Sequence, residues 1–214
     1  MSWNEEGKWD FCCPLLEEGF FPPYMDARHV ELIYRLVKSG LFKNILEIGS
    51  WNGFSTSAFV QAQIDGADFQ LTVCDIEIRD RLKQVLRKSP AEVTVLEMKS
   101  TVAIHKKYDL ILVDGDHRLS AVAPEIVQLL RCNTPNILAH DVFVQEKIDN
   151  TFGASWYEGA RHLADVFRHH TAYQHIEDHK KRPGEWTERG LFFASRWPET
   201  FKSVKDIWEE FLGA

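Results

Sequence analysis

The chain has 214 residues, enough for one domain that buries a core without help from disulfides or metal ions. Hydrophobic residues make up 44% and charged residues 27%, as in ordinary soluble globular proteins, and the formal net charge is -7. That charge argues against nucleic acid as a partner, because binding along a phosphate backbone needs a basic face.

The sequence shows no sign of a membrane or secretory segment. No apolar run approaches the roughly 20 residues that span a bilayer, and the acidic N-terminus has no apolar signal core. The four cysteines have no CxxC spacing; they are Cys12, Cys13, Cys74 and Cys132. We therefore expect reduced thiols in a cytoplasmic protein with no membrane partner.

Residues 1–25 are aromatic and irregular, and we expect them to form an N-terminal arm that packs on the domain or on a partner. Residues 26–214 are predicted to form a single domain. Its first helix is capped by Asp26, ends near Gly40 and buries one apolar face, made of Val30, Ile33, Tyr34 and Val37.

Short apolar runs then alternate with amphipathic stretches. The runs predict strands over 45–48, 71–74, 93–96, 110–113 and 136–139. Helices are predicted over 55–63, around 82–86 and over 119–130. Continuous apolar strands separated by helices are typical of right-handed βαβ units. The expected fold is therefore α/β, with a doubly wound, mostly parallel sheet that binds ligands at the carboxyl ends of its strands.

The C-terminal third has a different pattern. A long loop is predicted over 142–155, of a length that is often functional and suits a lid, followed by a helix over 156–168. Two strands, over 173–176 and 191–195, have no helix between them and indicate an antiparallel hairpin at the sheet edge. Three apolar residues are expected to close the core, namely Trp208, Phe211 and Leu212.

A glycine loop, Gly49-Ser50-Trp51-Asn52-Gly53, follows the first strand. Glycines let a backbone turn sharply and approach a ligand, and Ser55 or Thr56 is placed to cap the next helix. Asp75 ends the second strand, where an acid accepts hydrogen bonds from both ribose hydroxyls of a nucleoside. A tight turn and a solvated acid are the alternatives, but the spacing favours a nucleoside cofactor. A nicotinamide dehydrogenase would need G-x-G-x-x-G, which is absent here.

The densest polar clusters follow the fourth and fifth strands. They read Asp114-Gly115-Asp116-His117 and His140-Asp141. Carboxylate oxygens and imidazole nitrogens in such a place suit a divalent cation. Asp116 and His117 have an alternative explanation as the cap and first turn of the next helix, whereas each of the other two aspartates directly follows a strongly apolar strand.

Taken in order, these motifs resemble class I S-adenosylmethionine-dependent methyltransferases of the methyltransferase 24 family, over roughly residues 26–196. The resemblance implies a Rossmann-like methyltransferase domain whose sheet ends in an antiparallel strand. It also implies S-adenosylmethionine as cofactor, bound by residues matching the family's positions: Glu47, Gly49, Ser50, Trp51, Gly53, Ser55, Asp75, Ser100 and Asp114.

Relatives in this group include catechol-type and macrolide sugar O-methyltransferases. In the sugar enzymes, a strand-four Asp and two acids after strand five hold magnesium, and a His three residues beyond the first ligand is the base. Carried over, this makes Asp114 and Asp141 metal ligands, completed by His140 or Asp116, and makes His117 the general base. The chain departs from the pattern at His140, where the sugar enzymes carry an acid.

The predicted function is O-methylation of a small-molecule hydroxyl, assisted by a divalent cation that we expect to be magnesium. The alternatives are a non-catalytic S-adenosylmethionine-binding module, a metal-independent methyltransferase, and a relative that uses metal and cofactor for another reaction. A binding module has no need of the Asp114–His117 cluster. The sequence leaves open whether the protein forms a homo-oligomer.

Overall fold

The computed structural model describes residue 25 and residues 27–143, 157–178 and 190–213. Helices and strands alternate along most of this chain. In order, the elements are α1 (Ala27–Lys38), β1 (Asn44–Ile48), α2 (Phe54–Ile64), β2 (Gln70–Asp75), α3 (Asp80–Leu86), β3 (Thr94–Glu97), α4 (Ser100–Ala103), β4 (Leu110–Val113), α5 (Leu119–Arg131), β5 (Asn136–His140), α6 (Glu158–His169), β6 (Gln174–Asp178), β7 (Leu191–Ser195) and α7 (Pro198–Leu212).

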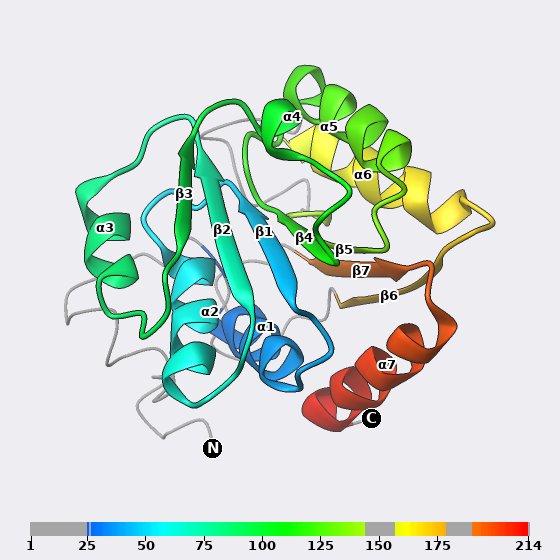
Figure 1. The fold of residues 1–214 in the computed structure, drawn as a ribbon. Helices are drawn as coiled ribbons and strands as arrows, with labels where there is room; N and C mark the ends of the chain where they lie inside the picture. Colours follow the sequence, from blue (N-terminus) through cyan, green and yellow to red (C-terminus); the bar gives the residue numbers. More distant parts are fainter. Residues whose placement is uncertain (1–24, 26, 144–156, 179–189, 214) are drawn as a thin grey trace.

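The strands form one seven-stranded sheet in the order β3-β2-β1-β4-β5-β7-β6 (Figure 1). The pairs from β3 to β5 are all parallel, and β7 runs antiparallel to both β5 and β6. This confirms the predicted doubly wound sheet with an antiparallel C-terminal hairpin. The strand order reverses between β1 and β4, and ligands of such sheets bind in the crevice at the carboxyl ends of the strands there.

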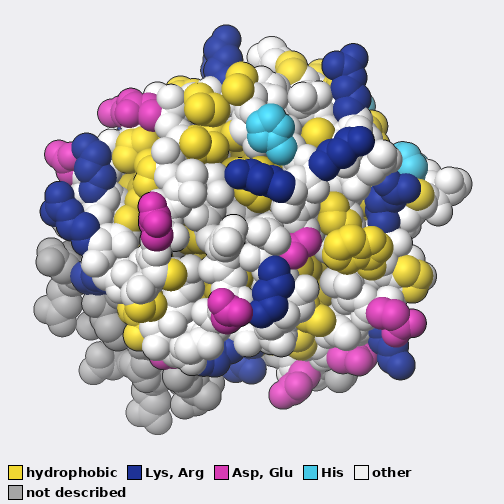
Figure 2. Space-filling view, viewed as in Figure 1, with side chains coloured by type: hydrophobic (Ala, Val, Ile, Leu, Met, Phe, Trp, Pro, Cys, Tyr) yellow, Lys and Arg dark blue, Asp and Glu magenta, His cyan; other side chains and the backbone are white. Residues whose placement is uncertain are grey.

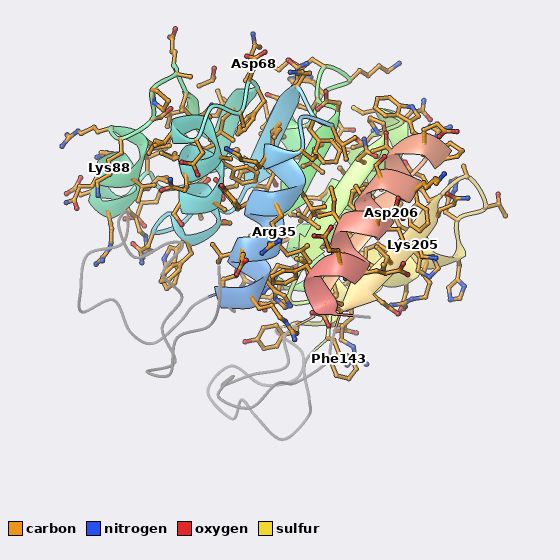
Figure 3. All side chains as sticks on the ribbon, turned by 90° about the horizontal axis from the view of Figure 1, so that it is seen from below. Arg35, Asp68, Lys88, Phe143, Lys205 and Asp206 are labelled. Atoms are coloured by element: carbon orange, nitrogen blue, oxygen red, sulfur yellow. The ribbon has the colours of Figure 1, made fainter. Side chains whose placement is uncertain are left out.

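Two apolar clusters cover the two faces of the sheet. Along β1, Ile45 belongs to the cluster that includes α1, α2 and α7, and Leu46 belongs to the cluster that includes α5 and α6. This is the side-chain alternation of a strand buried on both faces. Figure 3 shows α1 and α7 side by side over one face, with Arg35 on the first and Asp206 on the second. Trp208 of α7 is fully buried, as predicted.

Two predicted helix caps are wrong. The helix α2 begins at Phe54 with Gly53 as its N-cap, and no side chain caps it. Ser55 and Thr56 lie inside the helix, where their hydroxyls donate to Glu47. Likewise, the N-cap of α5 is Arg118, so the alternative in which Asp116 caps that helix is wrong.

Several strand and helix ends differ from the predicted ones. β6 extends two residues beyond the predicted end and therefore includes Asp178 at its carboxyl end. Neither α4 nor α7 was predicted as a helix. A four-residue helix has no periodicity, and of α7 only three apolar residues were expected to close the core. No helix among the described residues is long and apolar enough to cross a membrane.

Some predictions fall outside the described residues. These are the N-terminal arm except for Met25, the cap Asp26, the lid over 142–155 except for its first two residues, and the thiols of Cys12 and Cys13. Cys74 and Cys132 are described, and both are free thiols as expected.

Candidate active site

The loops that follow β1 and β4 pack backbone against backbone. Gly49 has a φ of 82°, and a Cβ at this position would lie 2.3 Å from the backbone oxygen of Asp114. The Asp114 N–H donates to the Ile48 carbonyl at 2.9 Å, which locks the two strand ends together. Only glycine fits at position 49, because any side chain would collide with the neighbouring loop.

Asp75 fixes the glycine loop from the end of β2. The Trp51 N–H donates to Asp75 Oδ2 at 2.8 Å, and the Glu77 N–H donates to Oδ1 at 3.3 Å. Trp51 has a φ of 39°, unusual for a bulky residue, and the guanidinium of Arg79 lies 5.2 Å from its ring centre. Each carboxylate oxygen has a second lone pair, so Asp75 is still able to accept bonds from ribose hydroxyls.

Glu47 lies directly beneath this loop and is fully buried. Its carboxyl group accepts hydrogen bonds from Ser55 and, at 2.6 Å, from the Thr56 hydroxyl. Burial raises the pKa of Glu47 to about 7, although the hydroxyl donors act in the opposite direction. Glu47 and Ser55 therefore bind each other and support the loop; their direct contact with a cofactor stays a prediction.

Ser100 is the first residue of α4, near the carboxyl end of β3. Its hydroxyl donates to the carboxyl group of Glu125 on α5, a buried residue whose pKa is raised by burial. This bond joins the two helices beside the carboxyl edge. The predicted contact of Ser100 with a cofactor stays a prediction.

The ends of β4 and β5 bring Asp114, His140 and Asp141 together. One ligand atom from each of the three lies within 4.8 Å of the other two. His140 Nδ1 is 3.2 Å from Asp114 Oδ1 and 3.2 Å from Asp141 Oδ1. Asp141 has a φ of 57°, a conformation that aspartate tolerates, and this turns the chain sharply after β5. The three predicted metal ligands thus form a compact cluster.

His117 faces the same cluster from the β4–α5 connection. Its Nε2 lies 3.0 Å from Asp141 Oδ2 and 3.9 Å from Asp114 Oδ1, and its ring stacks on Tyr157 with centroids 5.7 Å apart. Burial lowers the pKa of His117, but the two carboxylates outweigh burial and raise it above the ordinary value of 6.5. A bound cation would act in the opposite direction to these carboxylates, because it disfavours the imidazolium form.

The carboxylate of Asp116, the other predicted candidate ligand, is paired with the neighbouring Arg118. Both of its carboxylate oxygens accept bonds from the Arg118 guanidinium, and Oδ1 also accepts from the Arg118 N–H at 3.0 Å. The pKa of Asp116 is lowered, first by its bond to that side chain. Asp116 is therefore not part of the compact cluster.

Three residues near the cluster, Arg28, His29 and Asp178, were not predicted from the sequence. His29 Nδ1 lies 3.1 Å from His140 Nε2, and Asp178 forms an ion pair with Arg28 at 2.7 Å. The available signal was the pair Arg28-His29 next to the apolar face of the first helix. Periodicity alone treats such residues as the polar face of the helix, although both are buried here.

Comparison with known proteins agrees with this geometry. Residues 46–142 match the model of the methyltransferase 24 family, described as a methyltransferase domain. Over these residues, the chain is similar to a methyltransferase domain. The matched segment runs from β1 through the glycine loop to the Asp141 turn, so it includes all the clustered residues described above. Class I methyltransferases take their methyl group from S-adenosylmethionine, and the match supports the predicted enzyme of that class.

Several solved structures share the fold of this chain. An O-methyltransferase from Bacillus cereus in complex with S-adenosylhomocysteine is 20% identical, with a TM-score of 0.61 over 84% of each chain. An O-methyltransferase from Streptomyces achromogenes involved in tomaymycin synthesis, in complex with S-adenosylmethionine, is 15% identical, with a TM-score of 0.60 over 79% of each chain. A search of curated proteins gives no significant match.

Replacing Glu47 by Gln is expected to change how stability depends on pH. Because the pKa of folded Glu47 is about 7 and its ordinary value is 4.5, the folded protein keeps a proton that the unfolded chain releases between these values. Wild-type stability should therefore fall relative to the variant as pH rises from about 4.5 to 7, by on the order of 3 kcal/mol.

Urea denaturation across this pH range measures the difference. Glu97→Gln, at an exposed position at the end of β3, is the matched control for the substitution itself. A stability difference between wild type and Glu47→Gln that does not change with pH would contradict the assigned pKa.

Proposed function

We propose that this enzyme transfers a methyl group from S-adenosylmethionine to a hydroxyl of a small molecule, assisted by a divalent cation. The observation that carries the proposal is the clustering of Asp114, His117, His140 and Asp141 beside the glycine loop. A module that only binds the cofactor needs the loop and Asp75 but has no use for four ionisable groups at the neighbouring strand ends.

The cofactor is proposed to lie over the carboxyl ends of β1 and β2. Gly49, Trp51 and Gly53 form a loop whose backbone permits close approach, and Asp75 offers its carboxylate to the ribose hydroxyls. The solved structures with bound S-adenosylhomocysteine or S-adenosylmethionine support this placement through their shared fold. The methyl group would then point toward the ends of β4 and β5, where the polar cluster stands.

The donors of the cluster fit a divalent cation. The two aspartates supply carboxylate oxygens and His140 supplies Nδ1, and their mutual separations suit simultaneous coordination. Carboxylates suit magnesium and manganese, whereas imidazole favours first-row transition metals, so Mn²⁺ fits this mixed set better than the expected magnesium. A cation held there would lower the pKa of a bound acceptor hydroxyl.

The residues of the chain then have two tasks. They must hold the acceptor oxygen in line with the methyl group and sulfur, which is mainly a matter of positioning. They must also remove the hydroxyl proton, for which the His117 imidazole is proposed as the base, because its ring faces the cluster and stacks on Tyr157.

A small-molecule acceptor agrees with the surface charge. On the face shown in Figure 2, Lys and Arg side chains are interspersed with Asp, Glu and hydrophobic side chains. Together with the net charge of -7, this arrangement favours a small molecule over nucleic acid as the acceptor.

Removing the Asp75 carboxylate is expected to weaken cofactor binding. We expect S-adenosylhomocysteine to bind wild type in the micromolar range, about -7 to -9 kcal/mol. Asp75→Ala should cost about 1.5–3 kcal/mol, because it deletes hydrogen bonds to a charged group. Calorimetry measures both values.

Asp68→Ala is the matched control, because the Asp68 side chain is 97% exposed at the opposite edge of the sheet, and this variant should bind the cofactor normally. Binding of a nicotinamide dinucleotide instead would overturn the assignment.

Replacing His117 by Ala is expected to slow methyl transfer by about 10²–10⁴-fold, because the reaction loses its base. Cofactor affinity should stay nearly unchanged, since His117 belongs to the acceptor side of the cluster. Single-turnover transfer from labelled S-adenosylmethionine to an identified hydroxyl acceptor, followed from pH 5 to 9, gives the rate. A variant with an unchanged rate and an unchanged acidic limb would show that His117 is structural.

Exhaustive chelation tests the role of the cation. We expect transfer to stop without divalent cations and to return with Mn²⁺ or Mg²⁺. The second candidate is a metal-independent methyltransferase, favoured by the 3.2 Å contacts through which His140 itself can donate to the carboxylates. Full activity after chelation would establish that second candidate.

A further inference from the structure

A row of buried ionisable groups continues from the polar cluster to the far edge of the sheet. His140 pairs across β5 and β7 with Leu191, which in turn pairs with Asp178 of β6. Arg28 and His29, from the first turn of α1, lie between these two ends and contact both. Arg28, His29, His140 and Asp178 are each 2% exposed or less.

Such a row is costly to build. Each charged or polar group loses its hydration on burial and must regain it through well-placed partners. Two residues earlier in β5 the same face carries Leu138, which packs in an ordinary apolar core with Phe193 of β7. Apolar side chains would therefore join α1 to the sheet at a lower cost in free energy. This indicates that the polar row serves a function.

The contacts link the side chains of this row in series, with carboxylates at both ends. At one end, His140 Nδ1 faces Asp114 and Asp141 at 3.2 Å. In the middle, His140 Nε2 lies 3.1 Å from His29 Nδ1. At the other end, His29 Nε2 faces Asp178 Oδ2 at 3.7 Å, and Arg28 Nη2 lies 2.7 Å from the same oxygen.

A neutral imidazole carries one N–H and one lone pair, and carboxylates only accept. When a cation is bound between the two carboxylates and the Nδ1 lone pair of His140, the hydrogen of that ring must be on Nε2. His29 Nδ1, 3.1 Å from His140 Nε2, is placed to accept this hydrogen.

We propose that His29 is a positioning residue for the divalent cation of the proposed function: it accepts the Nε2–H of His140 and so aims the Nδ1 lone pair at the metal. Asp178, held by Arg28, lies behind the His29 ring, with Oδ2 3.7 Å from Nε2. This is an outer-shell arrangement, in which a partner behind a ligating histidine fixes its tautomer and ring direction. The inference rests on the cation of the proposed function and adds a residue from α1 to its site.

The test is Mn²⁺ binding to the full chain, measured by calorimetry. His29→Ala should weaken Mn²⁺ binding by about 10–100-fold, the usual loss when an outer-shell partner is removed. His29→Asn, whose amide oxygen can take the place of Nδ1 as acceptor, should restore most of the affinity. His105→Ala, at an exposed histidine before β4, is the matched control and should bind like wild type. Thermal unfolding and S-adenosylhomocysteine binding check that each variant is folded.

A second readout uses wild type alone and does not depend on the variants folding. In ¹⁵N spectra with a diamagnetic divalent cation, His140 should carry its hydrogen on Nε2; a hydrogen on Nδ1 would overturn the inference. Equal Mn²⁺ affinity of wild type and His29→Ala would also overturn it while leaving the metal site intact. If wild type binds no divalent cation, both this inference and the role of the cation fail, and S-adenosylhomocysteine binding by the same samples shows whether the methyltransferase assignment stands.

Discussion

The close approach of two backbones, at Gly49 and Asp114, determines where the polar side chains of this protein stand. It joins the ends of β1 and β4 at the point where the strand order reverses. Because parallel strands end at one edge, the side chains that follow β1, β2, β4 and β5 converge there. A side chain at position 49 would separate the two loops, and with them the proposed cofactor and acceptor halves of the site.

The same edge concentrates an unusual amount of buried charge. Glu47 lies under the glycine loop, and the row from Asp114 to Asp178 lies under α1. Each group has polar partners, so the cost of burial is offset but not removed. A protein that needed only a stable sheet would place apolar residues here. We therefore interpret the buried charge as serving ligands: Glu47 supports the loop proposed to bind the cofactor, and the row supports the proposed cation site.

Much of the fold could be predicted from the sequence, because its signals are local. The apolar runs marked the parallel strands, and the residues directly after them marked the carboxyl edge where Asp75, Asp114 and Asp141 now stand. The two wrong caps show where local reasoning fails. Ser55 and Thr56 have the right chemistry for a cap, but the buried carboxylate of Glu47 in the preceding strand is the stronger partner for their hydroxyls.

Contacts between distant segments could not be predicted. His29 and His140 are separated by 111 positions, and nothing in the periodicity of either segment points to the other. Asp178 lay beyond the predicted end of its strand, because the polar residues Glu177 and Asp178 resemble a turn. The sequence also does not reveal that Asp116 is held by Arg118, a choice between neighbours that only the geometry of the turn decides.

The central claim is that the carboxyl edge binds S-adenosylmethionine and a divalent cation side by side. The most direct measurement is a crystal structure of the full chain with S-adenosylhomocysteine and Mn²⁺, with data collected at the manganese edge. We predict that the ribose hydroxyls bind Asp75 and that an anomalous peak lies within bonding distance of Asp114, Asp141 and His140 Nδ1. A cofactor bound elsewhere, or only water between the two carboxylates in excess Mn²⁺, would contradict it.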